Sequence, residues 1–333
     1  MKSFITLGLS ILLLFTLCAC GGGGTPIIAD PSEKEDSTSP VAGSSEKEGG
    51  ILIGMTTMVE CSFFDAFEQG VRSAMRDGDR LIYVEGKLDA DFQQGVIEDF
   101  IAQGVDIVLY NPSDTAASLP SLQMMKAAGI PIINFDSPAA DMSYVDTYCA
   151  TDNYGAGALA ALFMIDEHPE GGTVAVIEFS AADATTMRAN GFVDTVEATP
   201  GWEVVTRLDG GNTTSTALPV AEDIIAAHPN LTAIFGTNDE TGLGAYSAIS
   251  AAGLNIHIYS VNGGPEAKQA MLSDGEAGIW RATSAQSPIL MGVKTMELAY
   301  KFLAGEKVED EYLIEPFIIC PANIDQYGHN DWQ

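Results

Sequence analysis

The chain has little positive charge. It carries 15 lysines and arginines against 46 aspartates and glutamates, which gives a formal net charge of -31 at pH 7. A surface of this kind repels phosphate backbones and anionic lipid headgroups. We therefore expect neither a nucleic-acid partner nor electrostatic attachment to a membrane.

Motifs for nucleotides, metals and activated nucleophiles are also missing. There is no P-loop, and the loose G-x-G-x-x-A pattern at Gly155–Ala160 is better explained by close helix packing than by a dinucleotide. The four histidines lack metal-ligand spacing, and Cys61 has no neighbouring His or Lys that would activate its thiol. We expect no enzyme, no metal and no cofactor. A secreted hydrolase using Asp136 or Glu240 is the alternative, and turnover of a sugar would reveal it.

The longest hydrophobic run is too short to cross a membrane. Lys2 precedes the run "FITLGLSILLLFTL", and small residues around "LCAC" follow it. A bilayer requires about 20 apolar residues, so the pattern predicts a secretory signal rather than a permanent anchor. The stretch Leu17–Cys20 resembles the bacterial lipobox. This resemblance implies that residues 1–19 are a lipoprotein signal peptide and that Cys20 carries the lipid.

The next segment has almost nothing to bury. Residues 21–50 are rich in Gly, Ser, Pro and charge. We therefore expect residues 20–50 to be a lipidated, flexible tether that connects the folded body to the membrane.

From Ile51 onward, short apolar runs alternate with segments of helical period. The segment "FFDAFEQGVRSAMRDG" repeats its apolar residues every three or four positions, as one face of a helix requires. Gly78, Gly104 and Gly129 stand where helices should end in a left-handed residue. Strand, helix, strand at this spacing predicts the α/β class, with parallel sheets covered on both faces.

The alternation of strands and helices is interrupted in residues 141–157. A short strand there is followed by a helix that begins at Asp152, and the alternation then resumes. We place lobe 1 at residues 51–150 plus about 287–314, and lobe 2 at 151–286 plus about 315–333. The tail contains one strand-like run, "YLIEPFIIC", which we expect to cross back between the lobes.

Cysteine is too scarce for a disulfide framework. Beyond the signal only Cys61, Cys149 and Cys320 remain, an odd number, so one internal bridge at most can form. Cys149 with Cys320 is the candidate pair, because both lie near predicted lobe crossovers. Three free buried cysteines are the equal alternative.

Four of the predicted strands end in an amide or a carboxylate. These residues are Asn111, Asp136, Asn238 and Asn262. Each could simply cap the following helix. In an open parallel sheet, however, ligands bind beyond the carboxyl ends of the strands. Two sheets whose carboxyl edges face one another would bring all four residues into one cleft.

Such a cleft suits an uncharged polyol. Asn can donate and accept hydrogen bonds, and Asp accepts them from hydroxyl groups. Phe63 and Phe64 can supply an aromatic face for a sugar ring, while Arg188 and Gln286 can donate to its oxygens.

The stretches "NPSDTAA", "IPIINFD", "ATDNYGAG", "RANGF" and "TNDETGLGA", in this order and at these separations, resemble the periplasmic sugar-binding proteins of the ribose-binding type, the solute receptors of ABC importers. The resemblance covers roughly Ile51 to Gly305. It implies two Rossmann-like lobes joined by a three-stranded hinge, which close on one monosaccharide-sized ligand. The ligand contacts that it implies are Thr57, Phe63, Phe64, Asn111, Asp136, Arg188, Asn238, Asn262 and Gln286.

Four positions depart from the ribose-binding pattern. Ser137 replaces an Arg, Asn262 an Asp, Asn212 an aromatic residue and Cys61 an Asn. One cation, one anion and one stacking face are lost together. The site therefore stays roughly neutral, which favours an uncharged polyol over an anion but does not imply ribose itself.

We expect a monomeric, extracytoplasmic lipoprotein that captures a monosaccharide or related polyol by hinge closure and delivers it to the permease of an ABC importer. The lipid on Cys20 would hold it at the membrane. Two alternatives remain open: a sugar or signal-molecule sensor that docks on a kinase or chemoreceptor, and a nucleoside-binding importer component.

Overall fold

The structure is a computed structural model, and it describes residues 49–333. The expected signal peptide, the lipid site at Cys20 and the tether as far as residue 48 lie outside the described residues. Within the described part, no helix is both long enough and apolar enough to cross a bilayer.

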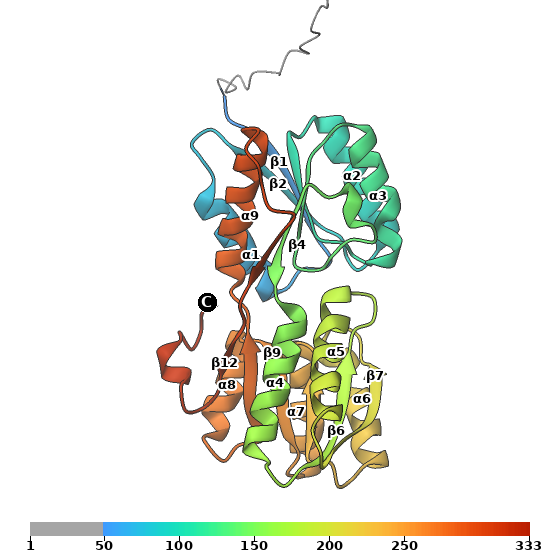
Figure 1. The fold of residues 1–333 in the computed structure, drawn as a ribbon, viewed down its shortest axis with the longest axis vertical. Coiled ribbons are helices and arrows are strands. Elements are labelled where there is room, and N and C mark those ends of the chain that lie inside the picture. Colours follow the sequence, from blue (N-terminus) through green and yellow to red (C-terminus); the bar gives the residue numbers. More distant parts are fainter. Residues whose placement is uncertain (1–48) are drawn as a thin grey trace, which may run out of the picture. The chain divides into compact units, whose positions relative to one another are not determined.

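Two six-stranded sheets form the centres of two lobes (Figure 1). The first sheet contains β1 (Leu52–Thr57), β2 (Arg80–Glu85), β3 (Ile107–Tyr110), β4 (Ile132–Phe135), β5 (Thr147–Thr151) and β11 (Glu311–Ile314). The second contains β6 (Gly172–Glu178), β7 (Trp202–Asp209), β8 (Ala233–Gly236), β9 (His257–Asn262), β10 (Trp280–Ala285) and β12 (Phe317–Ile319). All pairings are parallel except that of β12 with β10. The predicted two-lobed α/β fold is confirmed.

Helices cover both faces of each sheet (Figure 1). The first lobe has α1 (Ser62–Ala74) and α9 (Pro288–Leu303) on one face, and α2 (Ala90–Gln103) and α3 (Leu119–Ala127) on the other. The second lobe has α4 (Asn153–Glu167) and α5 (Asp183–Glu197) on one face, and α6 (Thr214–Ala227), α7 (Asp239–Ala252) and α8 (Pro265–Asp274) on the other. Three short 3₁₀ turns lie at Ala116–Ser118, Met142–Tyr144 and Ile324–Gln326.

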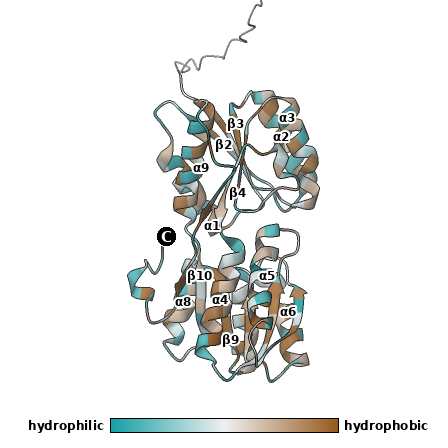
Figure 2. Ribbon diagram, in the orientation of Figure 1, coloured by the Kyte–Doolittle hydropathy of each residue, from teal (hydrophilic) through white to brown (hydrophobic). Residues whose placement is uncertain are grey.

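The central strands are rich in apolar residues because both of their sides are buried. In β3, Ile107 and Leu109 join the core under α1 and α9, while Val108 and Tyr110 join the core under α2 and α3. Side chains alternate between the two faces of a strand, so a strand covered on both faces must be a continuous apolar run. Figure 2 shows the hydrophobic colour concentrated on the strands, with hydrophilic residues on the outer surfaces of the helices.

Several helices end as the glycine pattern predicts. Gly104 caps α2 in the left-handed conformation with φ 68°, and Gly129 follows α3 with φ 72°. Gly78, which lies shortly after α1, also has a positive φ, of 92°. Glycine adopts this conformation without the steric cost that a Cβ imposes.

Three segments connect the two sheets: β5 to α4, β10 to α9, and β11 to β12. The run "YLIEPFIIC" crosses back between the sheets as expected, but it does so as two strands, one in each sheet, and not as a single strand. Pro316 lies between them, and its lack of an N–H prevents it from donating to a ladder. The boundaries of the two lobes at about residues 150, 286 and 314 remain our proposal.

The disulfide predicted between Cys149 and Cys320 is absent. Both are free thiols, as is Cys61. Cys149 lies in the first sheet, where its Sγ donates to the Met291 carbonyl at 3.8 Å, while Cys320 packs in the core of the second lobe. The two thiols therefore belong to separate cores, and the alternative of three free cysteines is correct.

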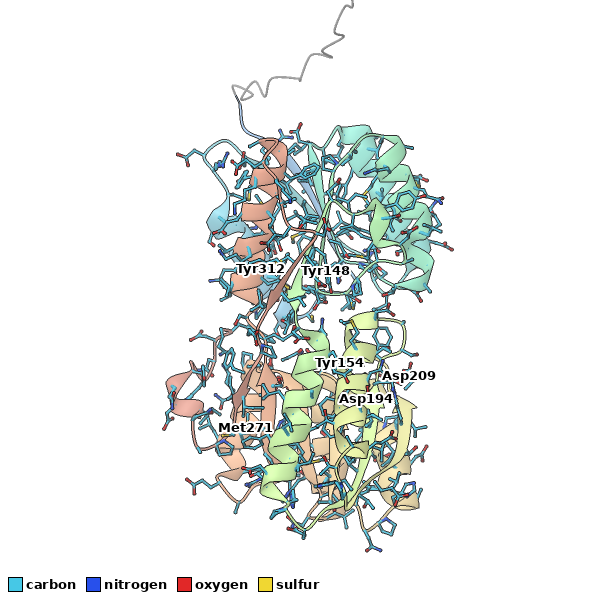
Figure 3. All side chains as sticks on the ribbon, in the orientation of Figure 1. Tyr148, Tyr154, Asp194, Asp209, Met271 and Tyr312 are labelled. Atoms are coloured by element: carbon cyan, nitrogen blue, oxygen red, sulfur yellow. The ribbon has the colours of Figure 1, made fainter. Side chains whose placement is uncertain are left out.

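The pattern at Gly155–Ala160 brings α4 and α5 into close contact. A Cβ on Gly157 would lie 1.9 Å from the Arg188 carbonyl oxygen, and one on Gly191 would lie 2.0 Å from the Tyr154 carbonyl oxygen. Tyr154 also donates from its hydroxyl to Asp194 Oδ2 at 2.9 Å, and Figure 3 shows these two side chains together. Close helix packing thus accounts for these glycines.

Candidate functional site

A cavity of about 380 Å³ lies at the carboxyl ends of both sheets. The strand order reverses between β1 and β3 in the first sheet, and between β6 and β8 in the second. Loops leave such a switch point in opposite directions, which opens a crevice there. Residues from both lobes line the cavity.

Most of the predicted contacts meet in this cavity. The wall includes Phe63, Phe64, Asp136, Arg188, Asn238, Asn262 and Gln286. The predicted convergence of strand ends from both sheets is therefore present in the structure.

Two predicted contacts, Thr57 and Asn111, do not line the cavity. The Thr57 hydroxyl lies 2.9 Å from the Tyr83 hydroxyl instead. Asn111 accepts from the Met58 N–H at 2.9 Å and donates to Asp136 Oδ2 at 3.3 Å. Both side chains form hydrogen bonds with neighbouring protein groups and do not face the cavity. Asn111 in particular positions the loop at Met58 and the carboxylate of Asp136, and both of these line the cavity.

Asp136 and Arg188 form an ion pair between the lobes. Asp136 Oδ1 lies 3.8 Å from an Arg188 Nη atom, and only 7% and 4% of these side chains are exposed. Burial raises the pKa of Asp136, while Arg188 and the amide of Asn111 oppose that rise. Burial likewise lowers the pKa of Arg188, which nearby carboxylates counteract. Each charge therefore depends on the other to remain in this site.

The other donors of Arg188 are satisfied within its own lobe. Its Nε donates to Asn153 Oδ1 at 2.7 Å, and one Nη donates to the Thr237 carbonyl at 3.1 Å and to Asn262 Oδ1 at 3.2 Å. These bonds fix the guanidinium plane at the floor of the cavity, so that it meets a ligand without rearranging.

Asn262 connects three polar groups of the wall. Its Oδ1 accepts from Gln286 Nε2 at 2.7 Å as well as from Arg188, and its Nδ2 donates to Glu240 Oε2 at 3.3 Å. An aspartate, which the ribose-binding pattern has here, could accept from Arg188 but could not donate to Glu240. The amide thus fits the carboxylate beside it.

Helix capping, the alternative explanation for the polar strand ends, applies to Asn238. Its Oδ1 accepts from the Thr241 N–H at 2.8 Å and completes a capping box at the start of α7. Asp136 and Asn262 are not N-caps, and both have positive φ angles, of 58° and 140°. Such angles are costly for residues with a Cβ and occur preferentially at functional sites.

The large apolar side chains of the wall come from the first lobe. Phe63 is 5% exposed and packs edge-on against Phe64, with ring centroids 5.3 Å apart. On the second lobe Asn212 stands where the ribose-binding pattern has an aromatic residue. It accepts from Asn238 Nδ2 at 2.6 Å, and its own Nδ2 lies 3.8 Å from Met58 Sδ of the first lobe.

Sequence reasoning missed much of the wall. The residues that it did not name as contacts are Met58, Val59, Glu60, Cys61, Ala182, Ala184, Thr185, Asn212, Thr213, Thr214, Ser215 and Glu240. Most of them follow β1, β6 and β7, and these loops leave the same edges of the two sheets. Applying the rule of carboxyl ends to every strand, instead of to four, would have found them.

The lobes also touch at the rim of the cavity. The Thr115 N–H donates to the Ala181 carbonyl at 3.0 Å, and the Ala184 N–H donates to the Ser137 hydroxyl at 3.3 Å. Ser137, which replaces an arginine of the ribose-binding pattern, thus joins the lobes and does not line the cavity. Across residues 49–333, no cluster of three His, Cys, Asp or Glu side chains could hold a metal ion.

Comparison with known proteins agrees with this architecture. The periplasmic binding protein domain matches residues 55–307 of the chain. The ribose import binding protein of Bacillus subtilis (strain 168) is 32% identical over 300 residues, which cover 90% of this chain and 92% of that protein.

Two solved structures share the fold. The binding protein of the arabinose ABC transporter from Shewanella sp. ANA-3, bound to α- and β-L-arabinofuranose, has a TM-score of 0.76 and 26% identity, and the match covers 83% of this chain and 93% of that one. An ABC transporter solute-binding protein from Actinobacillus succinogenes 130z, with bound D-allose, has a TM-score of 0.75 and 26% identity, with 84% and 100% covered. The chain belongs to the ribose-type group of the periplasmic binding protein family.

Proposed function

We propose that this protein is an extracytoplasmic receptor that captures a monosaccharide or related polyol between its lobes and delivers it to an ABC permease. One observation carries the proposal: polar side chains from the carboxyl edges of both sheets line a single cavity, with Phe63 and Phe64 beside them. Relatives of the chain include a ribose import binding protein and a D-ribose/D-allose-binding protein. Closure is favoured when a ligand is contacted from both lobes at once.

A sugar panel tests this function directly. We expect one or more pentoses, hexoses or polyols to raise the melting temperature of the protein by about 5 to 10 °C at a hundredfold excess over Kd, because a ligand that binds only the folded state stabilises it by mass action. Unchanged melting with every compound would contradict the proposal, and consumption of a sugar would support a hydrolase instead.

Replacing Gln286 by alanine should weaken binding without unfolding the protein. The Gln286 side chain is buried in the wall, and its Oε1 has no hydrogen-bond partner among the described residues. Loss of its bonds to a sugar should reduce the affinity about 10- to 100-fold, as measured by calorimetry. Gln123→Ala on the exposed side of α3 is the matched control. Equal affinities of the two variants would remove Gln286 from the site.

We also propose that Cys20 carries a lipid and that the mature protein is a monomer held at the cell membrane. The lipobox-like stretch Leu17–Cys20 supports the lipid, and the tether composition of residues 21–50 supports a body held at a distance. Cys20→Ser should move the protein from the membrane fraction to the soluble fraction, whereas Cys18→Ser should leave it on the membrane. Membrane association of the Cys20→Ser protein would exclude lipidation at this residue.

A further inference from the structure

Glu240 is a cavity carboxylate without a cationic partner. It lies in the first turn of α7 and lines the cavity beside Asn262, whose Nδ2 lies 3.3 Å from Glu240 Oε2. None of the ion pairs formed among residues 49–333 includes Glu240. A carboxylate can accept about four hydrogen bonds, and the Asn262 amide is the one side-chain donor to Glu240 among residues 49–333.

The charges of the wall do not balance. Glu60, Asp136 and Glu240 are acidic, and Arg188 is the cation among the residues that line the cavity. Arg188 lies 3.8 Å from Asp136 and is committed to that pair. The neutrality expected from the sequence counted the arginine lost at position 137 and the aspartate lost at 262, but it did not count Glu240. The cavity therefore has an excess of negative charge.

Two side-chain oxygens of the wall residues lack a hydrogen bond. Asp136 Oδ1 and Gln286 Oε1 make no hydrogen bond in the described part of the chain, and the two residues are 5% and 1% exposed. Both atoms are acceptors. A buried acceptor without a hydrogen bond costs free energy. These two atoms have almost no exposed surface, so among these groups it is Glu240 that offers acceptor oxygens to the cavity.

A second cavity, of about 200 Å³, adjoins Glu240. Its wall includes Asp239, Glu266 and the Trp332 side chain. Asp239 is occupied, since it accepts from the Ser260 hydroxyl at 2.6 Å and from the Gly264 N–H at 2.7 Å. Carboxylates and an aromatic ring together form a favourable environment for an ammonium group.

We propose that the ligand of this cavity is an amino sugar or amino polyol whose protonated amine binds at Glu240. The proposal rests on the sugar-binding function proposed above and names the substrate class of the same site. An ammonium group supplies three donors and one positive charge, which together satisfy the free carboxylate and offset the excess negative charge. Hydroxyl groups of the same molecule would meet Asp136, Arg188 and Gln286.

The protonation of Glu240 gives this binding a characteristic pH dependence. Burial and the neighbouring carboxylates of Asp239 and Glu266 raise the pKa of Glu240 to about 7, and Arg188 opposes the rise. The nearby Cys61 thiol is neutral in this range, because burial raises its pKa to about 12. Burial also raises the pKa of the adjacent Asp239, to about 6. A bound ammonium group stabilises the carboxylate forms of both residues, so binding releases protons and the affinity for an amino sugar rises from pH 5.5 to pH 7.5. A neutral sugar that accepts from protonated Glu240 would show the opposite trend.

Matched sugar pairs test the proposal by calorimetry on the full folded protein. D-glucosamine is compared with D-glucose, and D-galactosamine with D-galactose, at pH 5.5 and pH 7.5. We expect at least one amino sugar to bind about tenfold or more tightly than its neutral counterpart at pH 7.5, with a smaller ratio at pH 5.5.

Glu240→Gln removes the negative charge of this side chain while keeping its size and shape. We expect it to lower the affinity for the amino sugar about 10- to 100-fold while changing that for the neutral counterpart less than about threefold, and to weaken the pH trend, of which the adjacent Asp239 keeps a part. Glu222→Gln on exposed α6 is the control and should change neither. Binding of neutral sugars alone, or an unchanged preference in Glu240→Gln, overturns this inference and leaves the sugar receptor intact. If no sugar of either kind binds, both proposals fail.

Discussion

Replacing Arg188 by methionine should abolish sugar binding and lower the free energy of unfolding by about 3 to 5 kcal/mol. The substitution leaves Asp136 buried with no cation beside it, since its nearest positive charge is the Arg188 guanidinium at 3.8 Å. Burial already raises the pKa of Asp136, and loss of Arg188 raises it further. A carboxyl whose pKa is higher in the folded state than in the unfolded state loses stability as the pH rises. The loss of unfolding free energy in Arg188→Met should therefore be greater at pH 8 than at pH 5.

Two further variants test whether the uncompensated charge of Asp136 causes the loss of stability in Arg188→Met. Adding Asp136→Asn to Arg188→Met should restore much of the stability but none of the binding, because the uncompensated charge has gone while the ligand contacts are still missing. Arg207→Met is the matched control. Arg207 pairs with Glu178 on the partly exposed β6 and β7, and loss of such a pair should cost about 1 kcal/mol or less. Sugar binding by Arg188→Met at normal affinity would exclude this arginine from recognition.

Gly157→Ala should destabilise the protein by about 1 to 3 kcal/mol and weaken binding as well. The added Cβ would lie 1.9 Å from the Arg188 carbonyl oxygen, so α4 and α5 would have to move apart. Arg188 is carried on α5, and its guanidinium would then lose its place beneath the cavity. Chemical denaturation and calorimetry measure the two effects separately.

Gly95→Ala is the control for that substitution. Gly95 also lies inside a helix, α2, but a Cβ there would meet no atom within 4 Å. The change should stabilise the protein by about 0.5 to 1 kcal/mol, because alanine is the better helix former. If Gly157→Ala behaved like Gly95→Ala, neither the stability of the protein nor its sugar binding would depend on the close approach of α4 and α5.

The fold could be predicted from the sequence because its signals are local. Apolar runs as short as "IVLY" in β3 can be only buried strands when helical segments and glycines bound them on each side. The run "YLIEPFIIC" crosses between the sheets as expected, but its break into the two strands β11 and β12 was not predicted, because the run reads as one continuous apolar pattern. The choice between a Cys149–Cys320 bridge and three free cysteines stayed open in the sequence, because it depends on which core receives each thiol.

The site was predicted less completely, since a strand end specifies a position but not the direction of a side chain. Asn111 and Asp136 occupy equivalent places after neighbouring strands, yet Asn111 turns to the Met58 N–H and only Asp136 reaches the cavity. Adjacent acids diverge in the same way: Asp239 turns to Ser260, while Glu240 faces the cavity. Helix geometry in the first turn of α7 decides between them.

Most hydrogen bonds around the central ion pair stay within one lobe, although Asn153 Nδ2 of the second lobe also donates to the Asp136 carbonyl of the first at 3.5 Å. Arg188 is held by Asn153, Thr237 and Asn262 of the second lobe, while the Asp136 carbonyl accepts from the Tyr148 hydroxyl of β5 at 2.6 Å. If the lobes swing apart, each half keeps its own scaffold, and water need replace only a few bridging contacts. A sugar can then bind to one lobe before the other closes on it, and its release requires no rearrangement of the hydrogen bonds within either lobe.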